Sequence, residues 1–193
     1  MNEMVIPDCK INNWAIETFE VTKDESVIST LRLGIRFVPP GIYKKLVYKR
    51  CIVMSNTPAE IRDHYIFIRD AKGHILINGL GLGVCIFRIL EKEFLAKENY
   101  IKSITVIEKA KEVIQLVSPF IKDDRVLIYN ADAFEWKPPK NIHYDFVWHD
   151  IWNDICTDNL FEMHKLHRKY GKKANWQGSW SRSICEYYKK RRK

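Results

Sequence analysis

The sequence lacks the features that would place this protein in a membrane or outside the cell. Its 193 residues contain no apolar run long enough to cross a bilayer. Residues 1–5 lack the charged segment followed by an apolar segment that a secretion signal needs. The five cysteines are odd in number and widely scattered, with no C-x-x-C pair, which is typical of reduced thiols. We therefore expect a cytoplasmic protein with no membrane partner.

Two phosphate-binding motifs and a metal site are also missing. No Gly-Lys-Ser or Gly-Lys-Thr follows the glycine-rich residues 79–83, which excludes a P-loop. The dinucleotide fingerprint G-x-G-x-x-G is not met either, because the third glycine, Gly83, comes one residue too early. His164 and His167 share a face of a predicted helix near Asp154, but no further ligand follows at a fixed spacing. No metal site is therefore predicted.

Basic residues are concentrated at the C-terminal end. The net charge is +8, and 46% of the residues are apolar, enough for one globular domain with a full core. Residues 164–193 hold eleven Lys and Arg and one acid, whereas the rest of the chain is slightly acidic. This block favours an anionic partner, with nucleic acid the first candidate and a solvated tail the alternative. Aromatic residues interleave with it, as in nucleic-acid binders, although the two tryptophans are expected to anchor the last helix on the core: Trp176, Trp180, Tyr187 and Tyr188.

Residues 73–108 have the order strand, glycine turn, helix, strand, acid. Residues 74–78 and 103–107 are apolar runs typical of buried strands, and residues 84–97 between them keep an apolar face at helical spacing. The second strand ends on Glu108. This order predicts a nucleotide-binding β-α-β unit, with a tight turn that binds no ligand as the alternative. The glycines of the turn are Gly79, Gly81 and Gly83.

The residue types of this unit suit ligand binding. Glycines let the backbone turn sharply and let a ligand lie close, because no Cβ intervenes. Free N–H groups at the helix start point into the ligand space. The carboxylate of Glu108, at the tip of the second strand, can accept hydrogen bonds from both hydroxyls of a ribose.

Before this unit, the sequence predicts a small antiparallel sheet and one helix. Strand-like segments within residues 10–56 are separated by the turn of residues 39–41. Thr57 is placed as the N-cap of a helix that runs to about Ala71, and Glu60 closes a capping box. The polar residues of this helix either face the ligand cleft or form a solvated face: Glu60, Asp63 and His64.

After this unit, two more core strands and two helices are expected. Residues 125–129 form a strand followed by Asp132, for which a helix cap is one role and ligand binding another, and the two roles are compatible. The next strand ends on a polar cluster that contains Asp150. This is the best candidate for chemistry, because reactive groups collect at the carboxyl ends of parallel strands; a capping or loop acid is the alternative. Residues 157–170 and 179–190 have the pattern of helices, and no later strand is expected.

Together these patterns predict an α/β fold. We expect a Rossmann-like, mostly parallel sheet with helices on both faces, truncated at the C-terminal strands, and a small N-terminal antiparallel β piece. Residues 1–56 are expected to form that β region, residues 57–170 the nucleotide-binding core and residues 171–193 a basic helical tail. Assembly into a homodimer is left open.

Four segments resemble motifs of the class I S-adenosylmethionine-dependent methyltransferase superfamily: residues 75–83, 106–108, 126–133 and 144–150. The G-x-G-x-G turn and its spacing to the acid are similar to motif I of that superfamily. The nearest resemblance within it is to the spermidine synthase-like branch, which shares the N-terminal β piece, Asp-Ala-Phe after the third strand and an Asp-rich stretch after the fourth. Residues 148–152 and 176–180 also resemble segments of phage-encoded members.

The resemblance implies S-adenosylmethionine, or its decarboxylated form, as the cofactor. It places the three turn glycines at the methionine and ribose portions of that cofactor. It also places Glu108 at the ribose hydroxyls, and Asp132 with Ala133 at the adenine. Asn78 and Lys109, which adjoin these motifs, complete the expected cofactor-binding set.

The leading prediction is a methyltransferase in which Asp150 orients or deprotonates the methyl acceptor, with Asp154 as a second catalytic acid. The first alternative is a spermidine synthase-like aminopropyl transferase, although the Asp of the synthases' glycine loop and their C-terminal half are absent here. The second alternative is a non-catalytic protein that binds a nucleotide or nucleic acid on the same core.

Overall fold

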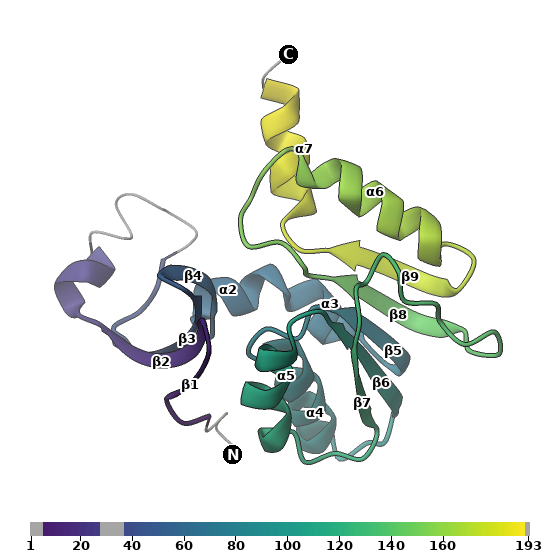
Figure 1. Ribbon diagram of the computed structural model, residues 1–193, viewed down its shortest axis with the longest axis horizontal. Coiled ribbons are helices and arrows are strands. Elements are labelled where there is room, and N and C mark those ends of the chain that lie inside the picture. Colours follow the sequence, from purple (N-terminus) through teal and green to yellow (C-terminus); the bar gives the residue numbers. More distant parts are fainter. Residues whose placement is uncertain (1–5, 28–36, 192–193) are drawn as a thin grey trace.

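The computed structural model describes residues 6–27 and 37–191 and contains two separate sheets (Figure 1). The first sheet is the expected antiparallel piece, with four strands in the order β1-β2-β3-β4. Residues 1–5, in which no secretion signal is predicted, and residues 192–193 of the basic tail lie outside the described residues. The four strands are β1 (Cys9–Ile11), β2 (Trp14–Val21), β3 (Gly41–Tyr48) and β4 (Cys51–Ser55).

The second sheet has five parallel strands in the order β7-β6-β5-β8-β9. They are β5 (Gly73–Asn78), β6 (Ile101–Glu108), β7 (Val126–Asn130), β8 (Tyr144–His149) and β9 (Ala174–Ser179). The helices are α2 (Pro58–Asp63), α3 (Tyr65–Asp70), α4 (Val84–Ala96), α5 (Lys111–Val117), η2 (Ser118–Phe120), α6 (Asn159–Tyr170) and α7 (Arg182–Arg191). The fold is therefore Rossmann-like, as predicted.

The connections place helices on both faces of this sheet. The chain runs from β5 through α4 to β6 and then through α5 to β7, which forms one edge of the sheet. It returns to β8 on the other side of β5 and runs through α6 to β9, which forms the opposite edge. Because such crossovers are right-handed, α4 and α5 cover one face and α6 covers the other (Figure 1). The strand order reverses between β5 and β8, and the crevice above such a reversal is where open α/β sheets bind ligands.

The strand β9 was not expected. Its sequence, Ala-Asn-Trp-Gln-Gly-Ser, has one large apolar residue and no alternation, so the prediction of no strand after residue 170 is wrong. Tertiary contacts stabilise it: β9 pairs with β8, and the ring of Trp176 stacks at 6.2 Å on Trp148, which stacks at 5.2 Å on Phe67. Trp180 is buried in the same core. Trp180 therefore belongs to the core and the partly buried Trp176 packs against it, as the alternative to base stacking predicted.

The single helix expected from Thr57 is broken at His64 into α2 and α3. The predicted capping box is wrong, because the Thr57 side chain makes no capping hydrogen bond. The carboxylate of Glu60 instead accepts two hydrogen bonds from Ser55, whose backbone N–H and hydroxyl donate to Oε2 at 2.9 and 2.8 Å. Helix α3 ends at Asp70, close to the predicted Ala71, and Gly73 begins β5 with a φ of +68°. The break buries His64 completely, next to the β8 tip.

The cysteines and the lengths of the helices bear on what the sequence lacks. All five cysteines are free thiols. Within residues 6–27 and 37–191, no helix combines the length and apolar character that crossing a membrane requires.

Candidate functional site

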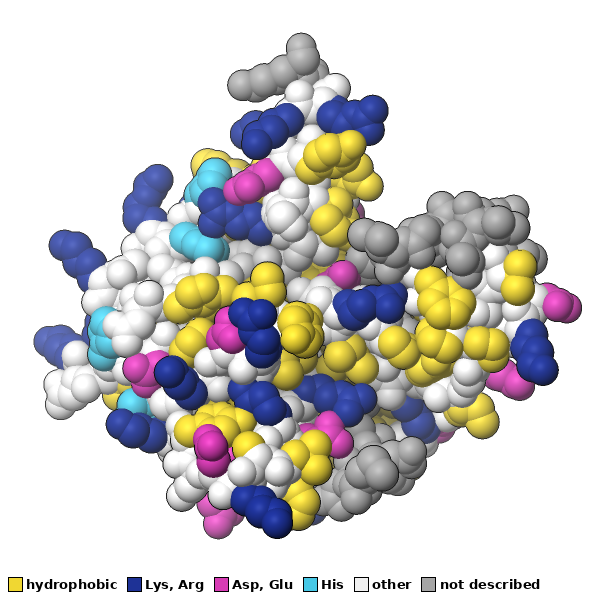
Figure 2. Space-filling view, turned by 180° about the vertical axis from the view of Figure 1, so that it is seen from behind, with side chains coloured by type: hydrophobic (Ala, Val, Ile, Leu, Met, Phe, Trp, Pro, Cys, Tyr) yellow, Lys and Arg dark blue, Asp and Glu magenta, His cyan; other side chains and the backbone are white. Residues whose placement is uncertain are grey.

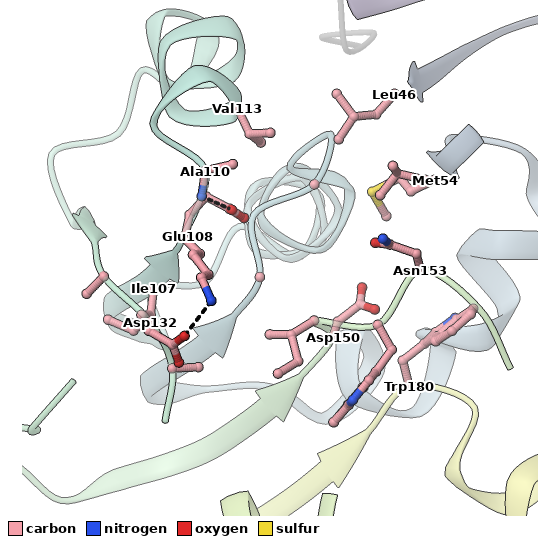
Figure 3. A pocket seen from close by; sticks show the side chains of 18 of the residues that line it. Leu46, Met54, Ile107, Glu108, Ala110, Val113, Asp132, Asp150, Asn153 and Trp180 are labelled. Atoms are coloured by element: carbon pink, nitrogen blue, oxygen red, sulfur yellow. Dashed lines mark hydrogen bonds and ion pairs between the residues drawn. The ribbon is translucent and has the colours of Figure 1, made fainter. Parts of the chain in front are cut away.

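A cleft of about 420 Å³ lies at the carboxyl ends of β5, β6 and β8. The glycine turn and the strand tips form one side of it, and residues of the N-terminal sheet form the other (Figure 3). Its volume is in the range of small-molecule sites. Seven residues of the predicted site line it: Gly79, Gly81, Glu108, Lys109, Asp132, Ala133 and Asp150.

The three turn glycines have positive φ angles, which only glycine adopts readily: +100° at Gly79, +51° at Gly81 and +74° at Gly83. All three also meet packing demands, and a Cβ on Gly81 would overlap the sulfur of Met54. A Cβ on Gly79 would overlap the backbone carbonyl of Asp150, and a Cβ on Gly83 would press on the ring of Phe87. Gly83 ends the turn as the N-cap of α4 and does not line the cleft.

Four N–H groups of the turn are already used within the protein, and the first of them, that of Gly79, donates to the carbonyl of Ile107 at 2.8 Å. Leu80 donates to Oε2 of Glu108 at 2.8 Å, and Gly83 donates to the carbonyl of Leu80 at 2.8 Å. The N–H of Leu82 donates to the sulfur of Met54 at 3.0 Å. These N–H groups precede Val84, the first residue of α4, so the expectation of free N–H groups at the start of that helix stays a prediction.

Glu108 occupies the β6 tip, as predicted, and borders the cleft. Its Oε1 accepts a hydrogen bond from the backbone N–H of Ala110 at 2.7 Å, and its Oε2 accepts the one from Leu80. Burial raises the pKa of Glu108, and the hydrogen bonds from backbone N–H groups oppose that shift. Each carboxylate oxygen has a second lone pair, so Glu108 retains acceptor capacity.

Asp132 follows β7 in a turn, and no helix begins there, so the helix-cap alternative is wrong. Its Oδ1 accepts a hydrogen bond from the N–H of Phe134 at 2.8 Å. Its Oδ2 pairs with Nζ of Lys109 at 2.8 Å, and this bond lowers the pKa of Asp132. With the buried Ala133, these residues form one wall of the cleft.

Asp150 lies just beyond β8, where its N–H donates to the carbonyl of Asn78 at 2.8 Å. Its carboxylate is largely buried and lies 3.8 Å from Nε2 of His64. Burial, with the neighbouring carboxylates Glu60, Asp63 and Glu108, raises the pKa of Asp150 to about 8. At neutral pH this carboxyl group is therefore mostly protonated and can donate a hydrogen bond.

Three predicted site residues lie away from the cleft lining: Asn78, Gly83 and Asp154. Asn78 is completely buried, and its Nδ2 lies 2.7 Å from Nδ1 of His149. Asp154 is exposed in the loop before α6. Among the residues that the structure describes, no group of three potential metal ligands comes together.

The N-terminal sheet contributes site residues that the sequence did not indicate. Trp14, Leu46 and Met54 reach the cleft from β2, β3 and β4. No motif links these residues to the glycine turn, because they belong to a different sheet. Glu60 also lines the cleft, so it faces the ligand space rather than lying on a solvated face of its helix.

No protein-family model matches the chain, and no curated protein matches it. Solved structures do. The N-methyltransferase NodS from Bradyrhizobium japonicum WM9 is 12% identical with a TM-score of 0.47, covering 66% of this chain and 72% of its own. An S-adenosylmethionine-dependent methyltransferase from Mesorhizobium loti is 13% identical with a TM-score of 0.43, covering 58% and 48%.

A third structure is the plantazolicin methyltransferase BpumL in complex with SAH. It is 15% identical with a TM-score of 0.39, covering 60% of this chain. The chain spans only 40% of the length of that protein. At such identities and TM-scores, these similarities carry no information on substrate or activity.

The raised pKa of Asp150 predicts a stability that depends on pH. The folded state holds the Asp150 proton up to about pH 8, whereas an unfolded carboxyl releases it near 3.8. The contribution of this group to the free energy of unfolding is fully present below about pH 4 and is lost as the pH rises through 8. We expect Asp150→Asn to raise the melting temperature at pH 9 by at least about 2–4 °C, equal to about 1 kcal/mol for a chain of this size.

The same substitution should leave the melting temperature almost unchanged at pH 4, where both side chains are neutral. Asp154→Asn, in the exposed loop, is the matched control and should show no such dependence on pH. Thermal denaturation at pH 4, 7 and 9 measures both variants. An equal effect of Asp150→Asn at all three pH values would contradict the assignment.

Proposed function

We propose that the protein is an S-adenosylmethionine-dependent methyltransferase that binds its cofactor in this cleft. The observation that carries the proposal is the convergence of the glycine turn, the Glu108 carboxylate and the Asp132 wall at the strand-order reversal of a Rossmann-like sheet. These groups come from three separate connections of the chain. The sequence motifs that resemble class I methyltransferases are those that line the cleft.

The charge of the cleft supports a positively charged ligand. Among the described residues, four carboxylates line it besides the neutral Asp150, namely Glu60, Glu108, Asp132 and Glu162, against one base, Lys109, which pairs with Asp132, in a protein whose net charge is +8. A concave surface of one sign concentrates ligands of the opposite sign. S-adenosylmethionine is a sulfonium, and when bound it supplies an electrophilic methyl group.

The residues of the cleft divide into groups with different tasks. Glu108 has lone pairs left for the ribose hydroxyls, and Gly81 lies beside it where a side chain would intrude. Asp132 and Ala133 form the wall assigned to the adenine. Asp150 faces the remaining space and orients the acceptor; as a neutral acid at pH 7 it donates a hydrogen bond, and above pH 8 it accepts a proton.

Aminopropyl transfer from decarboxylated S-adenosylmethionine is the first alternative. That reaction calls for two acids at the acceptor, and Asp154 is exposed and outside the cleft lining. Asp154 therefore does not supply the second acid, which counts against aminopropyl transfer by the predicted pair Asp150 and Asp154. A non-catalytic nucleotide-binding protein on the same core remains the second alternative, and it predicts ligand binding without turnover.

Isothermal titration calorimetry tests the cofactor. We expect the wild-type protein to bind S-adenosylmethionine, and Glu108→Ala to weaken binding at least about tenfold, because hydrogen bonds to a charged group contribute about 1.5–3 kcal/mol. Asp154→Ala, outside the cleft, should bind as the wild type does. Circular dichroism checks that Glu108→Ala is folded. Failure of the wild type to bind S-adenosylmethionine would overturn the methyltransferase proposal, and failure to bind the decarboxylated form as well would overturn the aminopropyl transferase alternative.

A second candidate function, nucleic-acid binding, is favoured by the charge of α6 and α7. Lys189, Lys190 and Arg191 end α7, which projects from the body of the protein (Figures 1 and 2). Tyr187 and Tyr188 are about half exposed on the same helix, where aromatic rings can stack on bases. On this proposal, the projecting helix holds a nucleic acid through its phosphates.

Binding of a labelled oligonucleotide at several salt concentrations tests this role. Replacing Lys189, Lys190 and Arg191 by Glu should lower affinity and reduce the slope of log K against log salt by about 0.7–0.9 for each phosphate that is no longer neutralised. A triple Glu variant at exposed lysines elsewhere, Lys97, Lys102 and Lys122, changes the net charge equally. An equal loss of affinity in both variants would mean that only the net charge matters.

A further inference from the structure

The side chain of Met54 lies on the glycine turn. Met54 belongs to β4 of the N-terminal sheet and points across the cleft toward the turn (Figure 3). A Cβ built on Gly81 would overlap the Met54 sulfur, so the thioether fills the space that the glycine leaves open. The sulfur also accepts the N–H of Leu82 at 3.0 Å. The part of the turn expected to meet a ligand is thus occupied by the protein itself.

The bond between Leu82 and Met54 is one that a ligand can replace. A thioether sulfur is a weak acceptor, whereas a charged oxygen accepts a hydrogen bond about twice as strong as a neutral one does. Methionine is unbranched and has three rotatable side-chain bonds, so it reorients at low cost. A ligand with a carboxylate would therefore compete well for the N–H of Leu82.

The backbone next to Met54 is fixed. Ser55 donates its N–H and its hydroxyl to Glu60 at 2.9 and 2.8 Å, which ties the end of β4 to α2. β4 is also paired with β3. Movement of the side chain alone, rather than of the sheet, is sufficient to uncover the turn.

We propose that Met54 is a displaceable plug of the glycine turn, whose side chain must leave Gly81 and Leu82 before a ligand can occupy them. The inference rests on the proposed function, since it concerns the same cleft. Met54 then acts as a residue that sets affinity, because every binding event includes the cost of separating its side chain from the turn. It also explains why Gly81 has to be a glycine in the absence of any ligand.

NMR spectroscopy of the wild-type protein labelled with ¹³C at the methionine methyl groups tests the displacement, with S-adenosylhomocysteine as the ligand. The chain has four methionines, and Met163 in α6 is completely buried away from the cleft lining. We expect the methyl signal of Met54, assigned with Met54→Leu, to shift and sharpen on titration. The signal of Met163 should stay in place.

Calorimetry with the same ligand measures the effect on affinity. Met54→Ala should bind S-adenosylhomocysteine about two- to tenfold more tightly than the wild type, the range that corresponds to one hydrogen bond of about 0.5–1.5 kcal/mol. Leu46→Ala is the matched control, because Leu46 lines the cleft from the same sheet and its apolar side chain cannot accept a hydrogen bond from the turn. It should not increase affinity. The Met163 signal verifies that each variant is folded.

The outcomes separate the two proposals. Absence of binding by the wild type and both variants overturns the proposed function and this inference with it. Binding with an unmoved Met54 signal, or weaker binding by Met54→Ala, overturns the displacement and leaves the proposed function standing. Equal gains for Met54→Ala and Leu46→Ala attribute the effect to a larger cleft, which also overturns it.

Discussion

The carboxylate of Glu108 joins the two turns that form the floor of the cleft. One oxygen accepts the N–H of Leu80 in the turn after β5, and the other accepts the N–H of Ala110 before α5. A single side chain at the β6 tip therefore fixes both connections. Burial raises the pKa of Glu108, the hydrogen bonds from backbone N–H groups oppose that shift, and the shape of the floor depends on the same bonds.

The N-terminal sheet turns this floor into an enclosed site. It packs beside α5 and brings Trp14, Leu46 and Met54 over the strand tips, where open α/β sheets otherwise leave a wide crevice. It also anchors α2, through Ser55 and Glu60. The result is an acidic, partly aromatic cleft in a protein whose net charge is +8.

The sequence predicted the parts of the site that depend on local chemistry. Strand, turn and acid follow one another within residues 73–108, so the placement of Glu108 required only the β-α-β pattern. Asp150 was predicted from the same logic, because a strand tip faces the crevice. Its raised pKa was not foreseeable, since the shift comes from burial and from Glu60 and Asp63, carboxylates of a distant helix.

Other features depended on contacts between distant segments. The strand β9 contains Gln177 and Gly178 where apolar residues were sought, and it is held by β8 and by the stack of Trp176 on Trp148. Met54 is distant from Leu82 in the chain, and no spacing rule links a methionine to a glycine turn. Such features become visible only when the two sheets are placed together.

A crystal structure of the protein with S-adenosylhomocysteine is the decisive test of whether the Glu108 floor binds an adenosine. We expect the adenosine in the cleft, with its ribose hydroxyls on Glu108 and its adenine beside Asp132. Density for the ligand outside this cleft, or a ribose that does not contact Glu108, would contradict the assignment.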